Sequence, residues 1–314
     1  MTEPYVRPDV RAFLDILEAH PRPAFTKDTI ADLRPLAAPG MAMLEPPVGE
    51  LAILRDFVIP GPGGDIRARL FDARAERAPS PVILFFHGGG FVIGDIDTHA
   101  PMAAEIARGL DLPLVSVDYR LAPEHPWPAA PDDAEAAARW VVDNGPALGR
   151  EFTGVVTCGD SAGGTLAVVT AMALTRTPAA APMVLLLALY PGIDRAVAHE
   201  SMRRFADGYG LDSSSMRFYD ESYAADPTHW RAAISTSDHT GMPPSLVVTA
   251  ALDPLRDGGR ALAGALTAAG VRTTYVEIEG TIHGFAGYRR LSPSANDDLA
   301  RAITLARAML AEHG

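Results

Sequence analysis

The sequence predicts an α/β protein in which a mostly parallel sheet is covered by helices on both faces. Short apolar runs of strand length recur along the chain, and helix-like stretches separate most of them. Most of these runs are apolar throughout, which is typical of strands buried on both faces. Functional groups of such proteins gather outside the carboxyl ends of the strands, so candidate residues are expected there.

The N-terminal part of the chain predicts a helix followed later by a hairpin. Residues 7–20 (RPDVRAFLDILEAH) have an apolar face at helical spacing. Residues 36–47 (LAAPGMAMLEPP) form a passage rich in Pro, Gly and Met, residues that often interrupt regular structure. Residues 54–73 predict two strands around a Pro/Gly turn, because apolar stretches flank the segment PGPGG. We expect this hairpin at an edge of the sheet.

Strands and helices alternate in the rest of the chain. Helix-like stretches such as PDDAEAAARWVVDN (131–144) lie between most of the apolar runs. Strands that alternate with helices indicate parallel pairing. The predicted strands cover residues 82–86, 113–117, 154–158, 182–190, 245–250 and 273–278.

One interval, residues 194–240, contains no buried-strand run but many aromatic, Met and charged residues. We interpret it as an inserted helical segment that forms a cap over the strand ends together with residues 1–50. The core is then expected at residues 51–193 and 241–314. A surface excursion without a role is the alternative interpretation of the interval.

Composition excludes several classes of function. The 39 acidic against 27 basic residues give a formal charge of −12, which repels phosphate backbones and argues against a nucleic-acid partner. Cys158 is the single cysteine, so no internal disulfide can form and a reducing, cytoplasmic location is expected. The first ten residues carry charges and no apolar run, so we expect no signal peptide, and no stretch approaches the ~20 apolar residues of a membrane span.

Ser161 is the first candidate for chemistry. It lies in GDSAG (159–163), a G-x-S-x-G pattern that directly follows a predicted strand and precedes a predicted helix. The small residues at 159 and 163 let the chain turn sharply, because larger side chains would collide with the neighbouring strand and helix. This context predicts a nucleophilic serine, and a serine that only caps the helix is the alternative.

A nucleophilic hydroxyl needs a base, and the base needs an acidic residue that orients it. Asp253 follows the predicted strand 245–250, and His283 follows the predicted strand 273–278. The order Ser161, Asp253, His283 along the chain matches the order expected after a G-x-S-x-G elbow. Asp257 is a rival carboxylate, but it would lie inside the next helix. The other eight histidines, among them His99 and His125, do not fit this position as well.

A glycine-rich segment supplies backbone N–H groups for a developing negative charge. The strand 82–86 ends in His87-Gly88-Gly89-Gly90, and Ala162 follows the serine. We therefore predict an oxyanion hole from Gly88, Gly89, Gly90 and Ala162. A phosphate-binding loop or a plain loop is the alternative, but no Lys follows at the P-loop spacing that binds phosphate. His87 is expected to brace the loop rather than act as a base.

These motifs together resemble the bacterial hormone-sensitive-lipase-like family of α/β-hydrolase esterases. The resemblance rests on HGGG, YRLAPEHPWPAA (119–130), GDSAGG, DPLRD and HGF, and it covers roughly residues 50–310. It implies an α/β-hydrolase fold with an eight-stranded, mostly parallel sheet and a small helical cap. It also implies carboxylesterase activity on short acyl chains, with Ser161 as nucleophile, His283 as base and Asp253 as its partner. In that family Gly89, Gly90 and Ala162 would form the oxyanion hole and Gly88 would support its loop.

Several supporting residues are interpreted as structural. Tyr119, Arg120 and Glu124 belong to a proline-rich loop that an Arg–Glu pair would pin. Asp160 either helps to set the elbow by hydrogen bonding or is a solvated carboxylate. Cys158 is interpreted as a small residue of the strand core.

The sequence therefore predicts a serine hydrolase that cleaves short-chain carboxylic esters through an acyl-enzyme. An amidase or deacetylase with the same three residues, a lipase on insoluble fat and a non-catalytic small-molecule receptor are the alternatives. No cofactor or metal is required by this chemistry. The expected partner is a small ester, and a homodimer is left open.

Overall fold

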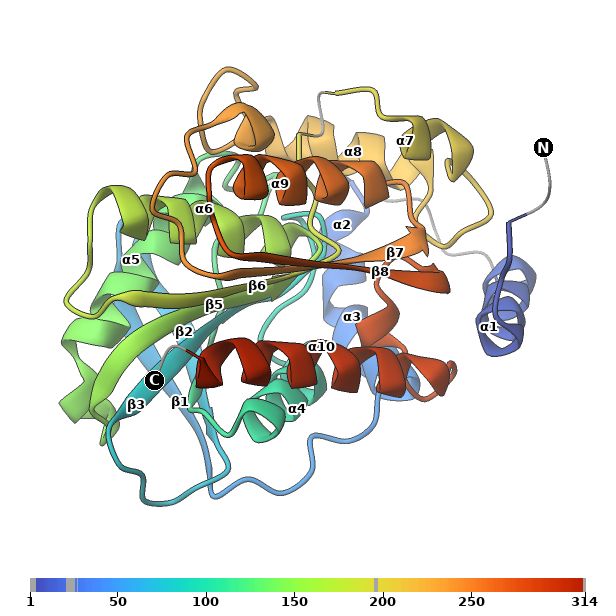
Figure 1. Ribbon diagram of the computed structural model, residues 1–314. Helices are drawn as coiled ribbons and strands as arrows, with labels where there is room; N and C mark the ends of the chain where they lie inside the picture. The colour runs from blue at the N-terminus through green and yellow to red at the C-terminus, as the bar shows by residue number, and fades with distance from the viewer. Residues whose placement is uncertain (1–3, 21–25, 27, 195–196, 313–314) are drawn as a thin grey trace.

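A twisted sheet of eight strands runs through the molecule, and helices pack on both of its faces (Figure 1). The computed structural model describes residues 4–20, 26, 28–194 and 197–312. Parts of the two predicted cap segments, residues 1–3, 21–25, 27 and 195–196, lie outside the described residues.

The strand order is β1-β2-β4-β3-β5-β6-β7-β8. The hairpin β1–β2 lies at one edge and pairs antiparallel, β2 also meets β4 antiparallel, and the strands from β4 to β8 pair in parallel. This arrangement confirms the predicted α/β class and the edge hairpin. The strands are β1 (Ile53–Gly61), β2 (Gly64–Asp72), β3 (Ser80–Phe86), β4 (Leu114–Val117), β5 (Phe152–Asp160), β6 (Met183–Leu189), β7 (Ser245–Leu252) and β8 (Thr273–Ile282).

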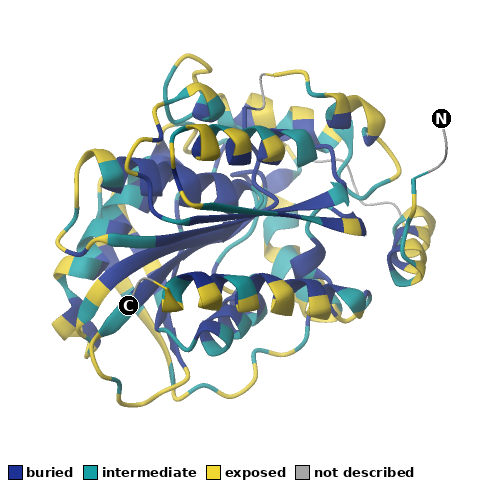
Figure 2. Cartoon of the chain, in the orientation of Figure 1, coloured by how far each residue is buried: buried dark blue, intermediate teal, exposed yellow. Residues whose placement is uncertain are grey.

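The central strands are apolar throughout because each of their faces meets a layer of helices. In β6, Leu185 and Leu187 join the apolar cluster on one side of the sheet, whereas Leu186 and Ala188 join the cluster on the other. Figure 1 shows α4 and α10 below the sheet and α6 and α9 above it, and Figure 2 shows the buried residues concentrated in the sheet and on the helix faces toward it. These core helices are α4 (Ala100–Leu110), α5 (Ala129–Asp143), α6 (Ala162–Arg176), α9 (Arg256–Ala268) and α10 (Ser294–Ala311).

The chain before β1 is more helical than its composition suggests. The predicted helix is α1 (Pro8–Ala19), and the Pro- and Met-rich passage also contains a helix, α3 (Ala37–Leu44), which the sequence did not predict. Pro39 is the third residue of α3, a first-turn position where a missing N–H leaves no helical hydrogen bond unmade. Between α1 and α3 lie α2 (Ile30–Leu33) and the short 3₁₀ helix η1 (Arg34–Leu36).

The interval between β6 and β7 is irregular with short helices, as the absence of apolar runs predicts. It contains α7 (Glu200–Arg204), α8 (Ser213–Tyr223) and η3 (Ile234–Thr236), and Asp212 caps α8 by accepting a hydrogen bond from Ser215 N–H at 2.7 Å. Two further 3₁₀ helices, η2 (Gly145–Leu148) and η4 (Phe285–Gly287), connect core elements. Within the described ranges, no helix combines the length and the apolar character that crossing a membrane requires.

Candidate active site

Ser161 lies on a sharp turn between β5 and α6. Its backbone has φ 52° and ψ −120°, a strained conformation for a residue with a side chain, and its N–H donates to Leu189 O at 2.9 Å. Gly163 lies so close to the end of β3 that a Cβ atom there would collide with the carbonyl oxygen of Phe86. The predicted reason for small residues around the serine is thus confirmed, and the turn exposes Ser161 Oγ at the sheet edge.

Asp253 and His283 follow β7 and β8 and meet Ser161 in one hydrogen-bonded row. Asp253 Oδ2 lies 2.8 Å from His283 Nδ1, and His283 Nε2 lies 2.8 Å from Ser161 Oγ. With a proton on Nδ1, the imidazole donates to the carboxylate and its Nε2 is free to accept the serine proton. The structure therefore brings together all three side chains that the sequence singled out.

The immediate neighbours of the row hold its members in place. The N–H of Leu255 donates to the second carboxylate oxygen of Asp253 at 2.8 Å, and the carboxylate is fully buried. The ring of Tyr190 meets the imidazole of His283 edge-on, with ring centres 5.1 Å apart. Asp257, the rival carboxylate, lies in the first turn of α9 and accepts from Arg256 and from Ser201 N–H, so it is not part of the row.

The glycine-rich loop after β3 borders the same space. Gly89 and Gly90 line the cavity at Ser161, and Gly90 has φ 63°, a conformation that glycine adopts without strain. Among the described residues, no hydrogen bond from the N–H group of Gly89 or Gly90 to a protein acceptor is found. Ala162 is the first residue of α6, where a helical N–H has no partner within the helix. The Gly88 N–H is engaged differently, because it donates to Asp160 Oδ1 at 2.8 Å.

Asp160 is a buried structural carboxylate and not a solvated one. Burial alone would raise its pKa, but the charge of His99 and the hydrogen bonds from His99 and Gly88 outweigh burial, and the pKa is lowered. His87 braces the loop as expected, with Nδ1 2.8 Å from Gly88 O. Tyr119 OH donates to His87 O at 2.7 Å.

The proline-rich loop 119–130 is pinned by partners that the sequence did not predict. Arg120 pairs with Asp133 at 2.8 Å, and Glu124 pairs with Arg34 at 2.8 Å, so the expected Arg120–Glu124 pair is wrong. Arg34 also donates to Val92 O at 2.7 Å, which ties the N-terminal segment to the loop that carries the glycines. Nothing in the local sequence pattern could reveal these contacts, because the partners of Arg34 lie 58 and 90 positions away.

The space in front of Ser161 is a cavity of about 300 Å³. Core residues form its floor, and residues of both predicted cap segments form its walls. The N-terminal segment contributes Phe13, Leu17, Met41 and Leu44, and the inserted segment contributes Gly210, Leu211, Ser215 and Tyr219.

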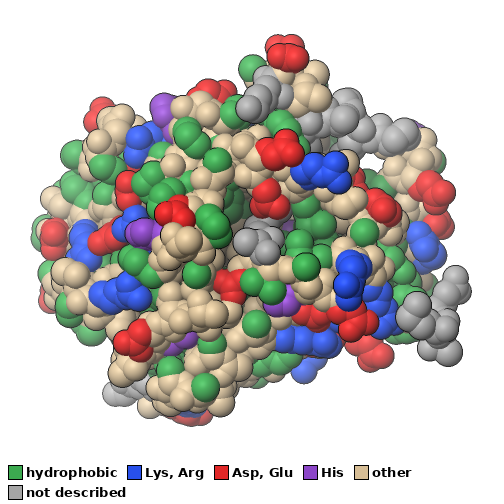
Figure 3. Space-filling model, turned by 90° about the horizontal axis from the view of Figure 1, so that it is seen from above, with side chains coloured by type: hydrophobic (Ala, Val, Ile, Leu, Met, Phe, Trp, Pro, Cys, Tyr) green, Lys and Arg blue, Asp and Glu red, His purple; other side chains and the backbone are tan. Residues whose placement is uncertain are grey.

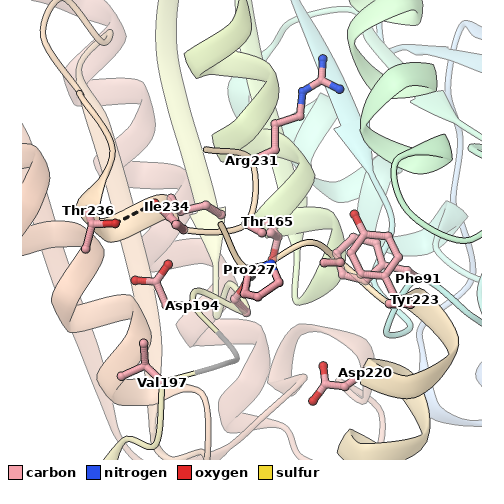
Figure 4. A pocket seen from close by; sticks show the side chains of 15 residues that line it. Phe91, Thr165, Asp194, Val197, Asp220, Tyr223, Pro227, Arg231, Ile234 and Thr236 are labelled. Atoms are coloured by element: carbon pink, nitrogen blue, oxygen red, sulfur yellow. Dashed lines mark hydrogen bonds between the residues drawn. The ribbon is translucent and has the colours of Figure 1, made fainter. Parts of the chain in front are cut away.

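A second, largely apolar cavity of about 320 Å³ lies beside α6 and α8. It reaches Thr165, one helical turn after Ser161, and Figure 4 shows Phe91 and Tyr223 together on one side with Asp194 and Val197 on the other. The Phe91 and Tyr223 rings stack with centres 3.8 Å apart. Thus α8 contributes side chains to both cavities.

Metal ligands and reactive thiols do not extend the site. In the described part of the chain, no three His, Cys, Asp or Glu side chains are grouped so that they could hold a metal ion. Cys158 is buried in β5, and burial raises the pKa of its thiol well above the usual range. It is therefore a strand-core residue, as predicted.

The doubly covered sheet with a serine on the turn after β5 defines an α/β hydrolase. A family model described as alpha/beta hydrolase fold matches residues 83–287, and the chain belongs to this family.

Several relatives of the chain are named esterases. The chain is 38% identical over 266 residues to the esterase LipI of Mycobacterium tuberculosis, an alignment that covers 82% of each protein. It is 35% identical to the carboxylesterase NlhH of the same species, over 96% of this chain and 97% of the relative. A solved structure of the ester-hydrolase EH1AB1 from the metagenome of Lake Arreo, complexed with a bipyridine phosphonate derivative, superposes with a TM-score of 0.90 at 36% identity. That superposition covers 96% of this chain and 98% of the other. The protein is an enzyme that hydrolyses carboxylic esters, as the sequence predicted.

Proposed function

We propose that this esterase works through Ser161 as the nucleophile, His283 as the general base and Asp253 as the carboxylate that orients the base. The observation that carries the proposal is the row of hydrogen bonds, 2.8 Å between Asp253 and His283 and 2.8 Å between His283 and Ser161. A serine hydroxyl is a weak nucleophile until a base in hydrogen-bond contact removes its proton.

The reaction proceeds in two halves. His283 takes the Ser161 proton while Oγ attacks the ester carbonyl, and the resulting oxyanion accepts hydrogen bonds from Gly89, Gly90 and Ala162 N–H. His283 then protonates the departing alcohol, which leaves an acyl group on Ser161. Water enters, gives a proton to His283 and attacks the acyl carbon, and the acid departs as Ser161 regains its proton.

The free N–H groups of the glycine loop support the oxyanion role. An amide that already bonds to the protein cannot donate fully to substrate, and this distinguishes Gly88 from its neighbours. We therefore assign Gly88 to loop support and its two neighbours, with Ala162, to the oxyanion hole.

The substrate proposed is a small ester with a short acyl chain. The Ser161 cavity of about 300 Å³ is at the lower end of the range for ligand pockets, about 300–1,000 Å³. Residues 1–50 and 194–240 form the cap that encloses it, because both segments line this cavity. Figure 3, which looks down on the side of α7, α8 and α9, shows hydrophobic side chains interspersed with acidic and basic ones, which does not favour a lipase that binds a fat surface.

The decisive experiment is Ser161→Ala with a series of aryl esters of graded acyl length. We expect kcat to fall by at least about 1,000-fold with an unchanged thermal unfolding midpoint. A phosphonate probe should label the wild type once per chain and leave the variant unlabelled. Wild-type turnover in the variant would overturn the proposal.

Three finer questions have their own assays. Hydrolysis of matched ester and amide pairs separates an esterase from an amidase or deacetylase, and we expect the ester to be the better substrate. Sedimentation velocity tests the homodimer that the sequence leaves open. A cytoplasmic location stays a prediction that cell fractionation would check.

A further inference from the structure

A pair of charged side chains in the wall of the Ser161 cavity has no part in the acyl transfer described above. Asp160 and His99 both border that cavity, yet their side chains are only 7% and 11% exposed. Buried charged groups are costly unless they are paired and hydrogen-bonded. Their place next to the nucleophile therefore needs a physical explanation.

The pair is joined to the glycine loop through a single oxygen atom. Asp160 Oδ1 accepts the Gly88 N–H at 2.8 Å and lies 3.5 Å from His99 Nε2. Gly88 immediately precedes Gly89 and Gly90, which both line the cavity. The Asp160 carboxylate thus anchors the backbone at the start of this loop.

The contacts of the two ring nitrogens of His99 indicate that each nitrogen carries a proton. Its Nδ1 lies 2.9 Å from Thr98 Oγ1, and that hydroxyl already donates its own proton to Asp95 O at 2.8 Å. With that proton on the bond to Asp95 O, Nδ1 is the donor to Thr98. Nε2 lies 3.5 Å from a carboxylate oxygen, which only accepts, so an ion pair with Asp160 needs a proton on Nε2 as well. A histidine with two donors is a cation.

The surroundings of His99 agree with this charge. Acidic groups face it from three places, namely Asp160 at the end of β5, Asp95 before α4 and Glu45 after α3. Burial alone would lower the pKa of His99, but these carboxylates outweigh burial, and its pKa is raised. His87 is the neighbouring imidazole, and burial together with the charge of His99 lowers its pKa to about 4, so it stays neutral.

We propose that His99 is a positioning residue for ester hydrolysis: as a cation it neutralises Asp160, so that this carboxylate anchors the Gly88 amide without opposing the oxyanion. The inference rests on the proposed function of Ser161 and of the glycine loop. Without His99, a buried negative charge would lie beside the site where the substrate oxygen becomes negative. In a water-poor site such a charge raises the barrier strongly.

The test compares His99→Gln, Asp160→Asn and the double variant with the wild type. Gln keeps a donor but no charge, so it leaves Asp160 uncompensated. We expect kcat of His99→Gln to fall about 10- to 100-fold while KM changes less than about twofold. The double variant has no charge to compensate, and we expect it to be at least about fivefold faster than His99→Gln. His125→Gln, on an exposed histidine, is the matched control and should behave as wild type.

The pH profile is a second readout that a purely structural role would not move. The kcat of the wild type should decline as the pH rises and His99 loses its proton, whereas Asp160→Asn should lack this decline. A trifluoromethyl ketone, which forms an oxyanion on the serine, should bind His99→Gln more weakly by the same factor as kcat falls. Should His99→Gln fail to fold, the profiles of the wild type and Asp160→Asn decide the question.

Three results would overturn the inference. They are a kcat within about twofold of wild type in His99→Gln, a double variant no faster than that single variant, and the same alkaline decline in Asp160→Asn. Ser161→Ala is assayed alongside. If it retains turnover, the proposed function fails; if it is inert while His99→Gln is fully active, only the role of His99 fails.

Discussion

The carboxyl edge of the sheet and the described parts of the two predicted cap segments, residues 1–50 and 194–240, are held in place in different ways. At the sheet edge, Ser161, Asp253 and His283 directly follow β5, β7 and β8, which belong to one backbone-bonded sheet. The predicted cap segments instead reach the core through isolated backbone hydrogen bonds, such as Arg7 N–H to Gly280 O and Arg290 N–H to Leu44 O, and through individual side-chain contacts. These include Arg7–Asp298, Asp9–Ser292, Arg34–Val92, Glu45–Arg289 and Arg231–Asp132.

This difference separates the groups that react from the groups that enclose the substrate. A backbone ladder fixes every strand end at once, so no single side chain decides where the reacting groups lie. A side-chain contact fixes one point, and its loss releases one part of the cap. Changes at the sheet edge should therefore affect turnover, whereas changes in the cap should affect substrate choice and stability.

The largest effect is expected from Asp253→Asn at the sheet edge. The amide cannot stabilise the imidazolium and favours the wrong tautomer of His283, so kcat should fall about 1,000- to 10,000-fold with little change in unfolding temperature. Steady-state kinetics and a thermal melt measure both quantities. Asp257→Asn removes the nearby carboxylate that lies outside the row and should keep kcat within about threefold. Equal losses in the two variants would contradict the assignment.

The next largest effect is expected at the buried ion pair that attaches the N-terminal segment to the core. Glu45 and Arg289 lie 2.6 Å apart, with side chains 1% and 4% exposed. Glu45→Gln leaves a buried guanidinium without its counter-charge, which should lower the free energy of unfolding by about 3 kcal/mol.

The matched variant replaces both partners, as Glu45→Leu with Arg289→Met. It buries no charge and should be much less destabilised than Glu45→Gln in urea titrations. If the double variant is less stable than Glu45→Gln, the ion pair itself stabilises the fold, beyond avoiding a buried unpaired charge.

A smaller effect is expected at Tyr219, where the cap meets the glycine loop. Its ring lies against Gly90 and is 8% exposed, and it lines the Ser161 cavity. Tyr219→Ala should enlarge the cavity and raise the ratio of kcat/KM for a hexanoyl over an acetyl ester by about tenfold. Arg217→Ala, an exposed residue of the same helix, should leave that ratio unchanged. An unaltered acyl preference in Tyr219→Ala would show that the cap does not select the acyl chain there.

The smallest effect concerns Asp9, which attaches α1 to the start of α10. Burial alone would raise the pKa of Asp9, but hydrogen bonds from Ser294 and Ser292 outweigh it, and the pKa is lowered from 3.8. Because the folded-state pKa lies below the unfolded value, the carboxylate stabilises the fold above pH 3.8, and this stabilisation is lost as the pH falls through the folded-state pKa.

Hydrogen exchange in α1 checks this prediction. Exchange should accelerate in the wild type as the pH is lowered toward the folded-state pKa, after correction for the intrinsic rate. Asp9→Asn should exchange faster already at neutral pH and respond less to acid. The same acid response in both proteins would mean that another group holds α1.

Much of the fold and the hydrogen-bonded row could be predicted because their patterns are local. Each of the six core strands contains one of the predicted apolar runs. In the structure, Ser161, Asp253 and His283 directly follow the strands that contain three of these runs. The helix α3 was missed because Pro and Gly within eight residues suggested a break, although Pro39 occupies a first-turn position where it is tolerated.

The supporting contacts could not be predicted because their partners are distant along the chain. Glu45 and Arg289 are 244 positions apart, and Arg34 and Glu124 are 90 positions apart. His99 was set aside because it follows no strand, and its significance comes from Asp160, which reaches it only in the folded chain.

The sequence by itself determined the α/β class, the positions of the core strands and the chemical types at their ends, since hydrophobic periodicity and turn residues act over a few positions. Only the tertiary structure decided which charges face one another, because ion pairs and buried hydrogen bonds depend on distance in space and on exclusion of water. The residue types of the row at Ser161 could be predicted from the sequence, whereas the distances between them are decided by the tertiary structure.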